Sequence, residues 1–401
     1  MPDTASDLNM WMMTDGRCSG DPIKIVSYFC ESLRQAGVPL WRVNIGQRFA
    51  NPLLIAWGVV WTPDGTETYD VTHARMLTDG YVGSAFEYIL ENQRPLHKSL
   101  RKLDKQNDHA SYLEFAEAGG TDYYATLLDY GDGSQHGCTF ATQHEDGFEA
   151  EYLALIEAAK PGLSCALEPI TMRKSTQSLL RTYLGTGASE AVWNGTIKRG
   201  ERETLEAVVM FSDLRGFTAF SENATERETI EALDGYFEVV VQAVEEQGGD
   251  VLKFMGDGIL SIFAVSNAEE RDDKCRCAAL AARNALTGLA ALNNTRRNAG
   301  QPELDMGIGM NVGQVSYGNI GSPGRLDFTV LGSAVNLASR VESLTKTIGT
   351  RVLATAAVAN AAPNLFAQCG QHKVRGLLQP IHIYGLIELA RADDEQKTWS
   401  G

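Results

Sequence analysis

Two aspartates stand at the ends of apolar segments, 44 positions apart. Asp213 ends the apolar run in VVMFSDLRGFTAFSE, residues 208–222, and Asp257 lies in the turn sequence KFMGDG. Two carboxylates that converge in a partly dry site repel each other, so one becomes neutral unless cations lie between them. Carboxylate oxygens suit Mg²⁺ or Mn²⁺, whose remaining ligands are commonly phosphates. The pair therefore predicts a metal site, although each aspartate taken alone is also typical of an ordinary turn.

Residues 205–390 show a regular pattern of strands and helices that would position these aspartates. Asp213 follows a buried strand, and Asp257 lies in a hairpin between two further strands. The pattern predicts strands at 205–211, 250–254, 259–264, 304–311, 315–320, 328–331 and 381–389, and helices at 225–246, 268–298 and 333–345. A βαββαβ order of this kind predicts an α+β sandwich of ferredoxin-like type.

Three motifs in this half of the chain resemble those of the class III nucleotide cyclases. They are FSDLRGFT, GGDVLKFMGDG and GNIGSPGRLDFTVLGSAVNLASRVE, and they follow one another in that family's order within residues 206–388. The resemblance implies that Asp213 and Asp257, together with the backbone of Leu214, hold two Mg²⁺ or Mn²⁺ ions per site. It also implies a catalytic domain that covers residues 205–390.

The same resemblance assigns the contacts to the nucleotide. The turn made by Gly216, Phe217 and Thr218 would cradle the triphosphate on its backbone N–H groups. Lys253 and Asp327 occupy the positions that distinguish adenine from guanine in this family. Adenine offers an acceptor at N1 and a donor at N6, which a lysine and an aspartate complement, whereas guanine offers the opposite pattern. The pair therefore favours ATP, because a wrong base leaves polar groups unpaired.

Asn336 and Arg340 lie four positions apart on one expected helix, so their side chains share a face. In the family such a pair positions the ribose and stabilises charge at the α-phosphate. Arg375 stands where many members carry a phosphate-binding lysine, and this change keeps the charge but alters the geometry. The family shares each site between two chains: one gives the metal aspartates, the other the base and transition-state residues. The resemblance therefore implies a head-to-tail homodimer.

The N-terminal half carries less specific patterns. Residues 1–20 are polar and predict a flexible N-terminus. Residues 21–147 predict a small α/β domain that resembles a GAF-like sensor, with helices at 22–36, 81–90 and 112–118 and strands at 40–45, 53–61, 123–129 and 135–142. Its aromatic residues either line a cavity for an unidentified small-molecule ligand or fill a core. They are Trp41, Trp57, Trp61, Tyr123 and Tyr124.

Residues 148–204 predict a helical connector followed by a glycine-rich linker at 185–202. Four apolar residues of the connector fall on a seven-residue repeat, which is typical of a coiled-coil seam that would dimerise the chain. They are Ile156, Leu163, Ile170 and Leu184. The alternative is a helix that packs on its own domain, and Pro161 and Pro169 are expected to break the run. Residues 391–401 predict a polar tail.

Bulk composition excludes some classes of function. The formal net charge of −16 argues against a general surface for nucleic acid or for an anionic membrane. Seven scattered cysteines and the lack of a long apolar run favour a cytoplasmic protein. The resemblance implies an adenylate cyclase that converts ATP to 3′,5′-cyclic AMP and pyrophosphate by two-metal catalysis and is regulated by its N-terminal half. The alternatives are a guanylate cyclase, or a catalytically weak cyclase fold that acts as a regulator.

Overall fold

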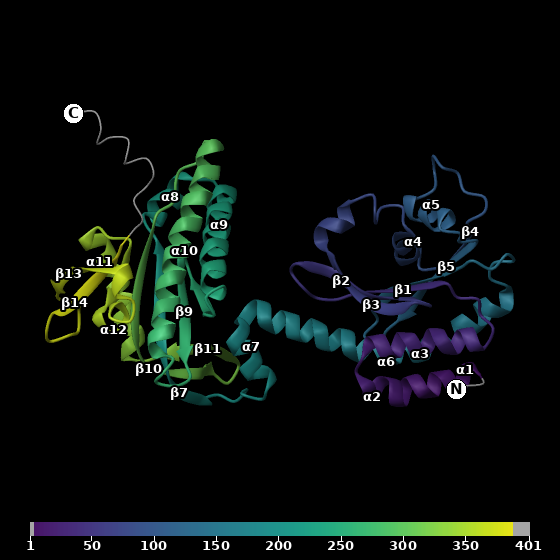
Figure 1. Cartoon of the computed structure of the whole chain (residues 1–401), viewed down its shortest axis with the longest axis horizontal. Coiled ribbons are helices and arrows are strands. Elements are labelled where there is room, and N and C mark those ends of the chain that lie inside the picture. The colour runs from purple at the N-terminus through teal and green to yellow at the C-terminus, as the bar shows by residue number, and fades with distance from the viewer. Residues whose placement is uncertain (1–3, 388–401) are drawn as a thin grey trace. The chain divides into compact units, whose positions relative to one another are not determined.

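The computed structural model describes residues 4–387, which fall into two compact units on either side of the bond between Thr182 and Tyr183 (Figure 1). The expected connector and linker at 148–204 is therefore not a separate segment, because its residues are shared between the two units. The expected tail at 391–401 lies outside the described residues. Within residues 4–387 no helix is both long enough and apolar enough to span a bilayer.

The first unit is built on a six-stranded sheet in the order β3-β2-β1-β6-β5-β4, in which every neighbouring pair is antiparallel. The strands are β1 Arg42–Arg48, β2 Leu54–Thr62, β3 Gly65–Thr72, β4 Leu96–Ser99, β5 Asp122–Asp129 and β6 Gln135–Thr142. The helices are α1 Ala5–Trp11, η1 Met12–Gly16, α2 Arg17–Ser19, α3 Pro22–Gln35, η2 His73–Leu77, α4 Ala85–Asn92, α5 Ala110–Glu117 and α6 Ala150–Leu184.

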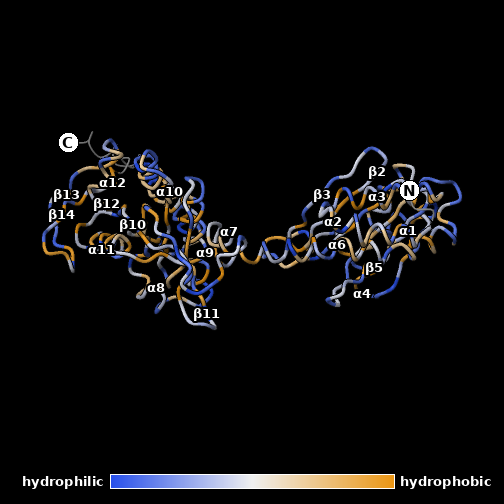
Figure 2. The backbone as a smooth tube through the Cα atoms, turned by 90° about the horizontal axis from the view of Figure 1, so that it is seen from below, coloured by the Kyte–Doolittle hydropathy of each residue, from blue (hydrophilic) through white to orange (hydrophobic). Residues whose placement is uncertain are grey.

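The alternation of side chains along the central strand β1 separates the two faces of this sheet. Val43 and Ile45 point into a core that is covered by α1, α3 and α6. Arg42, Asn44 and Gly46 point to the other face, where α4 and α5 lie. The tube in Figure 2 is accordingly hydrophobic along the inner strands and hydrophilic over the outer loops.

The local turn and cap signals of the first unit are confirmed, but two of its strands were not expected. The helix at 22–36 is α3, which begins with Pro22 after Asp21, whose side chain accepts hydrogen bonds from the first-turn N–H groups. The strands β3 and β4 escaped prediction because one is polar and the other has only four residues, and both lie at sheet edges. The prediction of a flexible N-terminus is wrong for the described part of residues 1–20, because residues 5–19 are helical and Leu8 and Met12 are buried.

Helix α6 overturns two expectations for the connector. It runs without interruption through Pro161 and Pro169, so the prediction that they break the helix is wrong. Three residues of the seven-residue repeat, Ile156, Leu163 and Ile170, are buried in the core of the first unit. Burial of these apolar side chains in the unit's own core stabilises the helix despite its prolines. They therefore do not form an exposed dimer seam, and the helix packs on its own domain.

The expected aromatic residues divide between the two faces of the first sheet. Trp57 and Trp61 are fully buried in the core under α3 and α6, and Tyr124 packs there too. Trp41 packs on the other side, and Tyr123 lines a cavity on that side. Filling a core is thus the main role of this set. The GAF-like identity of residues 21–147 stays a prediction.

The second unit is built on an eight-stranded sheet in the order β13-β14-β12-β10-β7-β9-β8, with β11 paired to β10. Its strands are β7 Arg202–Leu214, β8 Asp250–Met255, β9 Gly258–Val265, β10 Met306–Ser322, β11 Arg325–Leu331, β12 Val352–Thr355, β13 Phe366–His372 and β14 Ile381–Leu386. Its helices are α7 Thr186–Trp193, α8 Phe217–Asn223, α9 Glu226–Glu245, α10 Arg271–Asn298, α11 Ser333–Ile348, α12 Ala356–Ala359 and η3 Pro363–Leu365. The succession β7-α9-β8-β9-α10-β10 is the expected βαββαβ order.

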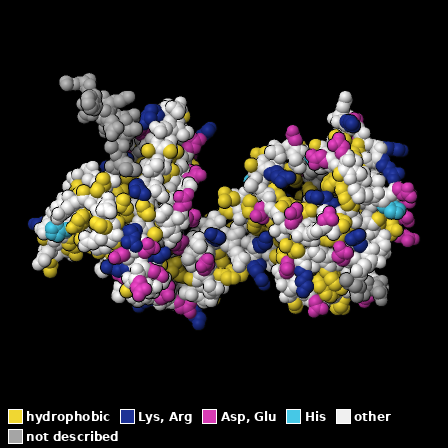
Figure 3. Space-filling view, in the orientation of Figure 1, with side chains coloured by type: hydrophobic (Ala, Val, Ile, Leu, Met, Phe, Trp, Pro, Cys, Tyr) yellow, Lys and Arg dark blue, Asp and Glu magenta, His cyan; other side chains and the backbone are white. Residues whose placement is uncertain are grey.

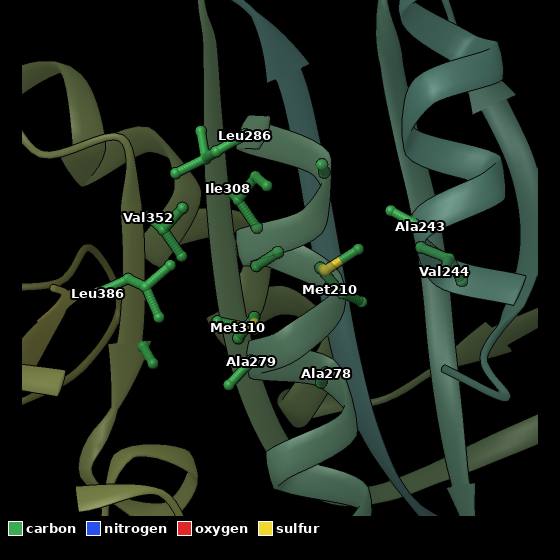
Figure 4. Packing of buried hydrophobic residues seen from close by; sticks show 14 of the residues in the cluster. Met210, Ala243, Val244, Ala278, Ala279, Leu286, Ile308, Met310, Val352 and Leu386 are labelled. Carbon is green, nitrogen blue, oxygen red and sulfur yellow. The ribbon is translucent and has the colours of Figure 1, made fainter. Parts of the chain in front are cut away.

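Alternation along β7 sorts its side chains between two cores. Val208 and Met210 lie under α9 and α10, whereas Ala207 and Val209 pack on the side of α7 and α11. Figure 4 shows α10 lying over the sheet, with its alanines turned toward Met210 and the neighbouring strands. Because alanine side chains are short, this helix lies close to the strands that deliver the candidate site.

The expected linker at 185–202 contains a docked helix, α7. The backbone N–H groups of Thr186 and Gly187 both donate to the carboxylate of Asp250 at the start of β8, each over 3.1 Å. Gly187 has no room for a side chain, because a Cβ would stand 2.6 Å from Oδ2 of Asp250. Ala188 is fully buried against the sheet. This segment is therefore part of the second unit.

Candidate active site

Strand β7 carries Asp213 near its C-terminal end, on the face of the sheet that α11 covers. Asp213 lies opposite Gly258 of β9, and a Cβ on that glycine would stand 3.3 Å from Oδ2 of Asp213. Asp257 precedes Gly258 in the β8–β9 turn, where Gly256 adopts a φ of 68°. The two aspartates thus come together. Burial, followed by the negative charge of Asp257, raises the pKa of Asp213 above its usual value.

Helix α11 brings a third carboxylate and a cation to the same place. Nζ of Lys346 lies 3.6 Å from Oδ1 of Asp213. Glu342 is buried, and its burial, followed by the charge of Asp213, raises its pKa. The helix approaches the sheet closely at Gly309, where a Cβ would overlap the backbone nitrogen of Glu342. Glu342 and Lys346 are not among the sequence-based candidates, although their spacing of four places them on one helical face.

Arg215 stabilises the turn after β7 through hydrogen bonds. It belongs to the motif FSDLRGFT but is not among the sequence-based candidates either. Its guanidinium donates to Oδ2 of Asp305 over 3.2 Å and to the carbonyl oxygens of Thr345 and Thr350 over 3.2 and 3.1 Å. Gly216 then adopts a φ of 68°, which a glycine tolerates at little cost. Phe217 starts the short helix α8, and Thr218 is exposed. The predicted cradle at 216–218 therefore sits directly beside Asp213.

Lys253 and Asp327, 74 positions apart in the sequence, form an ion pair. Nζ of Lys253 donates to Oδ2 of Asp327 over 2.7 Å, across the gap between β8 and β11. The lysine side chain is 28% exposed and the aspartate 60%, so the pair faces solvent on one side. An amine donor and a carboxylate acceptor thus stand side by side, as recognition of adenine would require.

Asn336, Arg340 and Arg375 form a further group. Asn336 is exposed in the first turn of α11, and Arg340 lies one turn later and is half-buried. Arg375 is exposed in the loop between β13 and β14. The next residue, Gly376, lies against Arg340, since a Cβ there would stand 2.8 Å from Nη1. Two cations therefore share this neighbourhood.

Helix geometry keeps Asn336 and Arg340 away from Asp213 of their own chain. With 3.6 residues per turn, Asn336 and Arg340 lie about 40° apart around α11, whereas Arg340 and Glu342 lie about 160° apart. Lys346, which contacts Asp213, follows Asn336 by ten residues, or about 15 Å along the axis. One chain therefore does not bring all of the predicted site residues together.

A comparison with protein families decides what this domain is. A family model described as "Adenylate and Guanylate cyclase catalytic domain" matches residues 201–387, which include all of the site residues described above. Residues 201–387 are therefore a class III nucleotide cyclase domain.

Two curated relatives are similar to part of this cyclase. Adenylate cyclase 1 of Rhizobium meliloti (strain 1021) is 33% identical over 194 residues, which are 47% of this chain and 28% of the relative. An adenylate cyclase of Anabaena cylindrica is 35% identical over 166 residues, which are 40% of this chain and 32% of the relative. The cyclase thus spans about a third or less of the length of these relatives. A solved structure, guanylyl cyclase Cya2, is 31% identical and matches 48% of this chain and 96% of that one, with a TM-score of 0.42.

The donor set of this cyclase fits a divalent metal ion. Class III cyclase domains generally use Mg²⁺ or Mn²⁺, and the carboxylates of Asp213 and Asp257 offer the hard oxygen atoms that these ions prefer. Their mutual repulsion, seen in the raised pKa of Asp213, is relieved by a cation. Within residues 4–387 no group of three or more His, Cys, Asp or Glu side chains is placed to hold a metal by itself.

Proposed function

We propose that this cyclase is an adenylate cyclase that converts ATP to 3′,5′-cyclic AMP and pyrophosphate. The observation that carries the choice of nucleotide is the 2.7 Å contact between Lys253 and Asp327. The lysine would donate to N1 of adenine, and the aspartate would accept from its N6 amino group. Guanine presents a donor at N1 and an acceptor at O6, so it would face each side chain with the wrong partner. Such mismatches leave desolvated polar groups unpaired and are strongly selective.

We further propose that each active site is shared by two copies of the chain in a head-to-tail homodimer. Asp213, Asp257 and the backbone of Leu214 would come from one copy, while the base-reading pair and α11 of the other would complete the site. This arrangement is supported by the opposed faces of α11, because Glu342 and Lys346 turn toward their own Asp213. A twofold dimer contains two equivalent sites of this kind.

The substrate would be bound through its phosphates at one end and its base at the other. Backbone N–H groups of Gly216, Phe217 and Thr218 would hold the triphosphate beside Asp213. Arg340 would donate to an oxygen of the α-phosphate and stabilise the charge that develops there, and the nearby Arg375 would bind the phosphates of the leaving group. Asn336 would hold the ribose so that its 3′-hydroxyl faces the α-phosphorus.

In the proposed reaction the 3′-oxygen of the ribose forms a bond to the α-phosphorus, its hydroxyl proton passes to solvent or to a substrate phosphate, and the bond to the pyrophosphate oxygen breaks. Asp213 and Asp257 would hold two Mg²⁺ or Mn²⁺ ions, which when bound lower the pKa of the attacking hydroxyl and stabilise charge on the phosphate oxygens. The remaining contribution of the protein is to fix the geometry of attack and to place cations around the α-phosphate. The N-terminal unit would regulate this rate.

The test is to incubate the full chain with ATP or with GTP in the presence of Mn²⁺ and to identify the product by chromatography. Cyclic AMP from ATP, at a rate well above that of cyclic GMP from GTP, supports the proposal. A preference for GTP would assign a guanylate cyclase. The absence of both products would assign a cyclase fold that acts only as a regulator. The Asp257→Asn variant is the matched control, because it removes one carboxylate charge while keeping the size of the side chain.

A further inference from the structure

The first unit contains a cavity of about 220 Å³ on the face of its sheet that α4 and α5 cover. In Figure 3 this unit shows a recess with hydrophobic side chains inside it and Lys or Arg side chains at its edge. The floor of the cavity is β1, and the walls come from β3, η2, α4 and α5. Of the β1 residues that line the cavity, Arg42, Asn44 and Gly46 are half-buried, whereas Arg48 at the end of the strand is exposed.

Three arginines line this cavity: Arg42 and Arg48 from β1, and Arg75 from η2. The lining residues, all of which the structure describes, include no aspartate or glutamate, and the ion pairs within residues 4–182 involve other side chains. Nε of Arg42 is buried and has no hydrogen-bond partner among the described residues. The guanidinium carbon of Arg42 lies 5.9 Å from the centroid of the Phe115 ring, so the group packs on an aromatic face while its Nε still lacks an acceptor. A buried donor without an acceptor is destabilising, and a bound anion would supply that acceptor.

The polar groups around Arg42 and Arg75 converge on the hydroxyl of Tyr69. This hydroxyl donates to Oδ1 of Asn44 over 2.6 Å. Tyr69, Arg42 and Arg75 line the same cavity. Burial raises the pKa of Tyr69 to about 12, although the positive charges of Arg75 and Arg42 oppose the rise. The phenol stays neutral and puts no negative charge in the way of an incoming anion. Arg48 lies six residues from Arg42, about 20 Å along the strand.

Much of the remaining lining is apolar, and the cavity has the size of a small ring. Its apolar lining residues include Ile55, Val71, Met76, Phe86, Leu90 and Phe115. The ring of Phe86 packs directly on β1 at Gly46, where a Cβ would stand 2.9 Å from it. A dry protein cavity of about 150 Å³ accepts a benzene molecule, so the volume here holds one such ring with a small polar group attached.

We propose that this cavity binds a small organic carboxylate whose body is about the size of one aromatic ring. Its carboxylate lies near the Tyr69 hydroxyl, between the guanidinium groups of Arg42 and Arg75, and its apolar body lies against Phe86 and Phe115. A planar guanidinium matches a carboxylate in a bidentate manner, which accounts for arginine rather than lysine at these positions. The inference concerns the first unit alone and does not depend on the proposed cyclase reaction.

Calorimetric titration of the nucleotide-free full chain with benzoate tests the inference, with benzamide as an uncharged probe of the same shape. Benzoate is expected to bind saturably and at least about tenfold more tightly than benzamide, because only the anion pairs with the guanidinium groups. Arg42→Gln and Arg75→Gln are each expected to weaken benzoate binding at least about tenfold. Arg48→Gln is the matched control from the same strand and is expected to change the affinity less than about threefold.

A thermal unfolding curve without ligand separates lost binding from lost folding. Because Arg42 forms no ion pair within residues 4–182 and its Nε lacks an acceptor, Arg42→Gln is expected to unfold at a temperature close to or above that of the parent chain. Equal affinities for benzoate and benzamide would overturn the proposal, and so would a loss on Arg48→Gln as large as on Arg42→Gln. Binding of phenyl phosphate without binding of benzoate, or no saturable binding of benzoate up to about 10 mM, would also overturn it. Since no nucleotide is present, these outcomes stand whether or not the chain forms cyclic AMP.

Discussion

Mixing two inactive variants tests whether each active site is shared by two chains. We expect Asp213→Ala to remove the metal-binding half of a site and Asn336→Ala to remove the ribose-positioning half. On α11, Asn336 lies about 15 Å along the axis from Lys346, the residue that contacts Asp213 in the same chain. The two changes should therefore act in different halves of a shared site, and each variant alone should form little cyclic AMP.

The expected recovery follows from twofold symmetry. In an equal mixture that exchanges freely, about half of the dimers contain one chain of each kind. Such a dimer has one site with both defects and one site with neither, so about a quarter of all sites are intact. At equal total protein, the rate of cyclic AMP formation from ATP should thus return to about a quarter of the rate of the unmodified chain.

The matched control is a mixture of Asp213→Ala with Asp257→Ala chains. Both changes fall in the same half of a site, so every site in the mixed dimer still lacks an aspartate and no rate should return. Rates are measured by chromatography of cyclic AMP after the mixed chains have been left to exchange. The shared-site reasoning fails if the first mixture stays at the level of its separate variants, or if both mixtures recover equally.

Three further predictions concern base choice, packing and pH. Combining Lys253→Glu with Asp327→Ser should lower the ratio of ATP to GTP turnover at least about a hundredfold; an unchanged ratio would contradict the assigned base contacts. Gly309→Ala should lower both the melting temperature and the cyclase rate, because its Cβ overlaps α11, whereas Gly324→Ala, whose Cβ meets open space, should alter neither. Burial lowers the pKa of His136 to about 4 in the folded chain. Between pH 6.5 and pH 4 this imidazole is therefore protonated in the unfolded chain but not in the folded chain, so stability falls as the pH falls. In urea titrations over this pH range, the free energy of unfolding of the parent chain should fall by about 3 kcal/mol more than that of the His136→Gln variant. Equal decreases in the two proteins would refute this prediction.

The second unit was the more predictable, because its site residues sit in local motifs. Asp213 and Asp257 end a strand and occupy a hairpin turn, and both positions follow from short-range patterns of apolar residues and glycines. The family resemblance singled out Lys253 and Asp327 as base-reading residues, which stays a prediction, and the structure adds the contact between them. Glu342 was not predicted, because a carboxylate on a helix is usually solvated, and only the close packing at Gly309 buries it.

The first unit was less predictable, because its outcome depends on which elements cover which faces. The seven-residue repeat through Ile156 and Leu163 fits a partner helix or the unit's own sheet equally well, and periodicity does not distinguish the two. Pro161 and Pro169 reduce the intrinsic stability of α6, but tertiary packing outweighs that local cost. The cavity around Arg42 depends on β2 lying between β3 and β1 in the sheet. The polar sequence of β3 does not indicate this arrangement.

The packing of α7 on the second unit determines where the chain can be truncated to study that unit alone. A chain shortened to begin at Ile197 would lack the N–H groups of Thr186 and Gly187, and Asp250 would lose both of its hydrogen-bond donors. It would also uncover the apolar surface that Ala188 covers. Asp250 lies three positions along β8 from Lys253, which we propose to contact the base. A slow rate in such a protein would reflect a damaged fold rather than lost regulation. A protein that begins at Tyr183 keeps this helix, and its rate can be compared directly with that of the full chain.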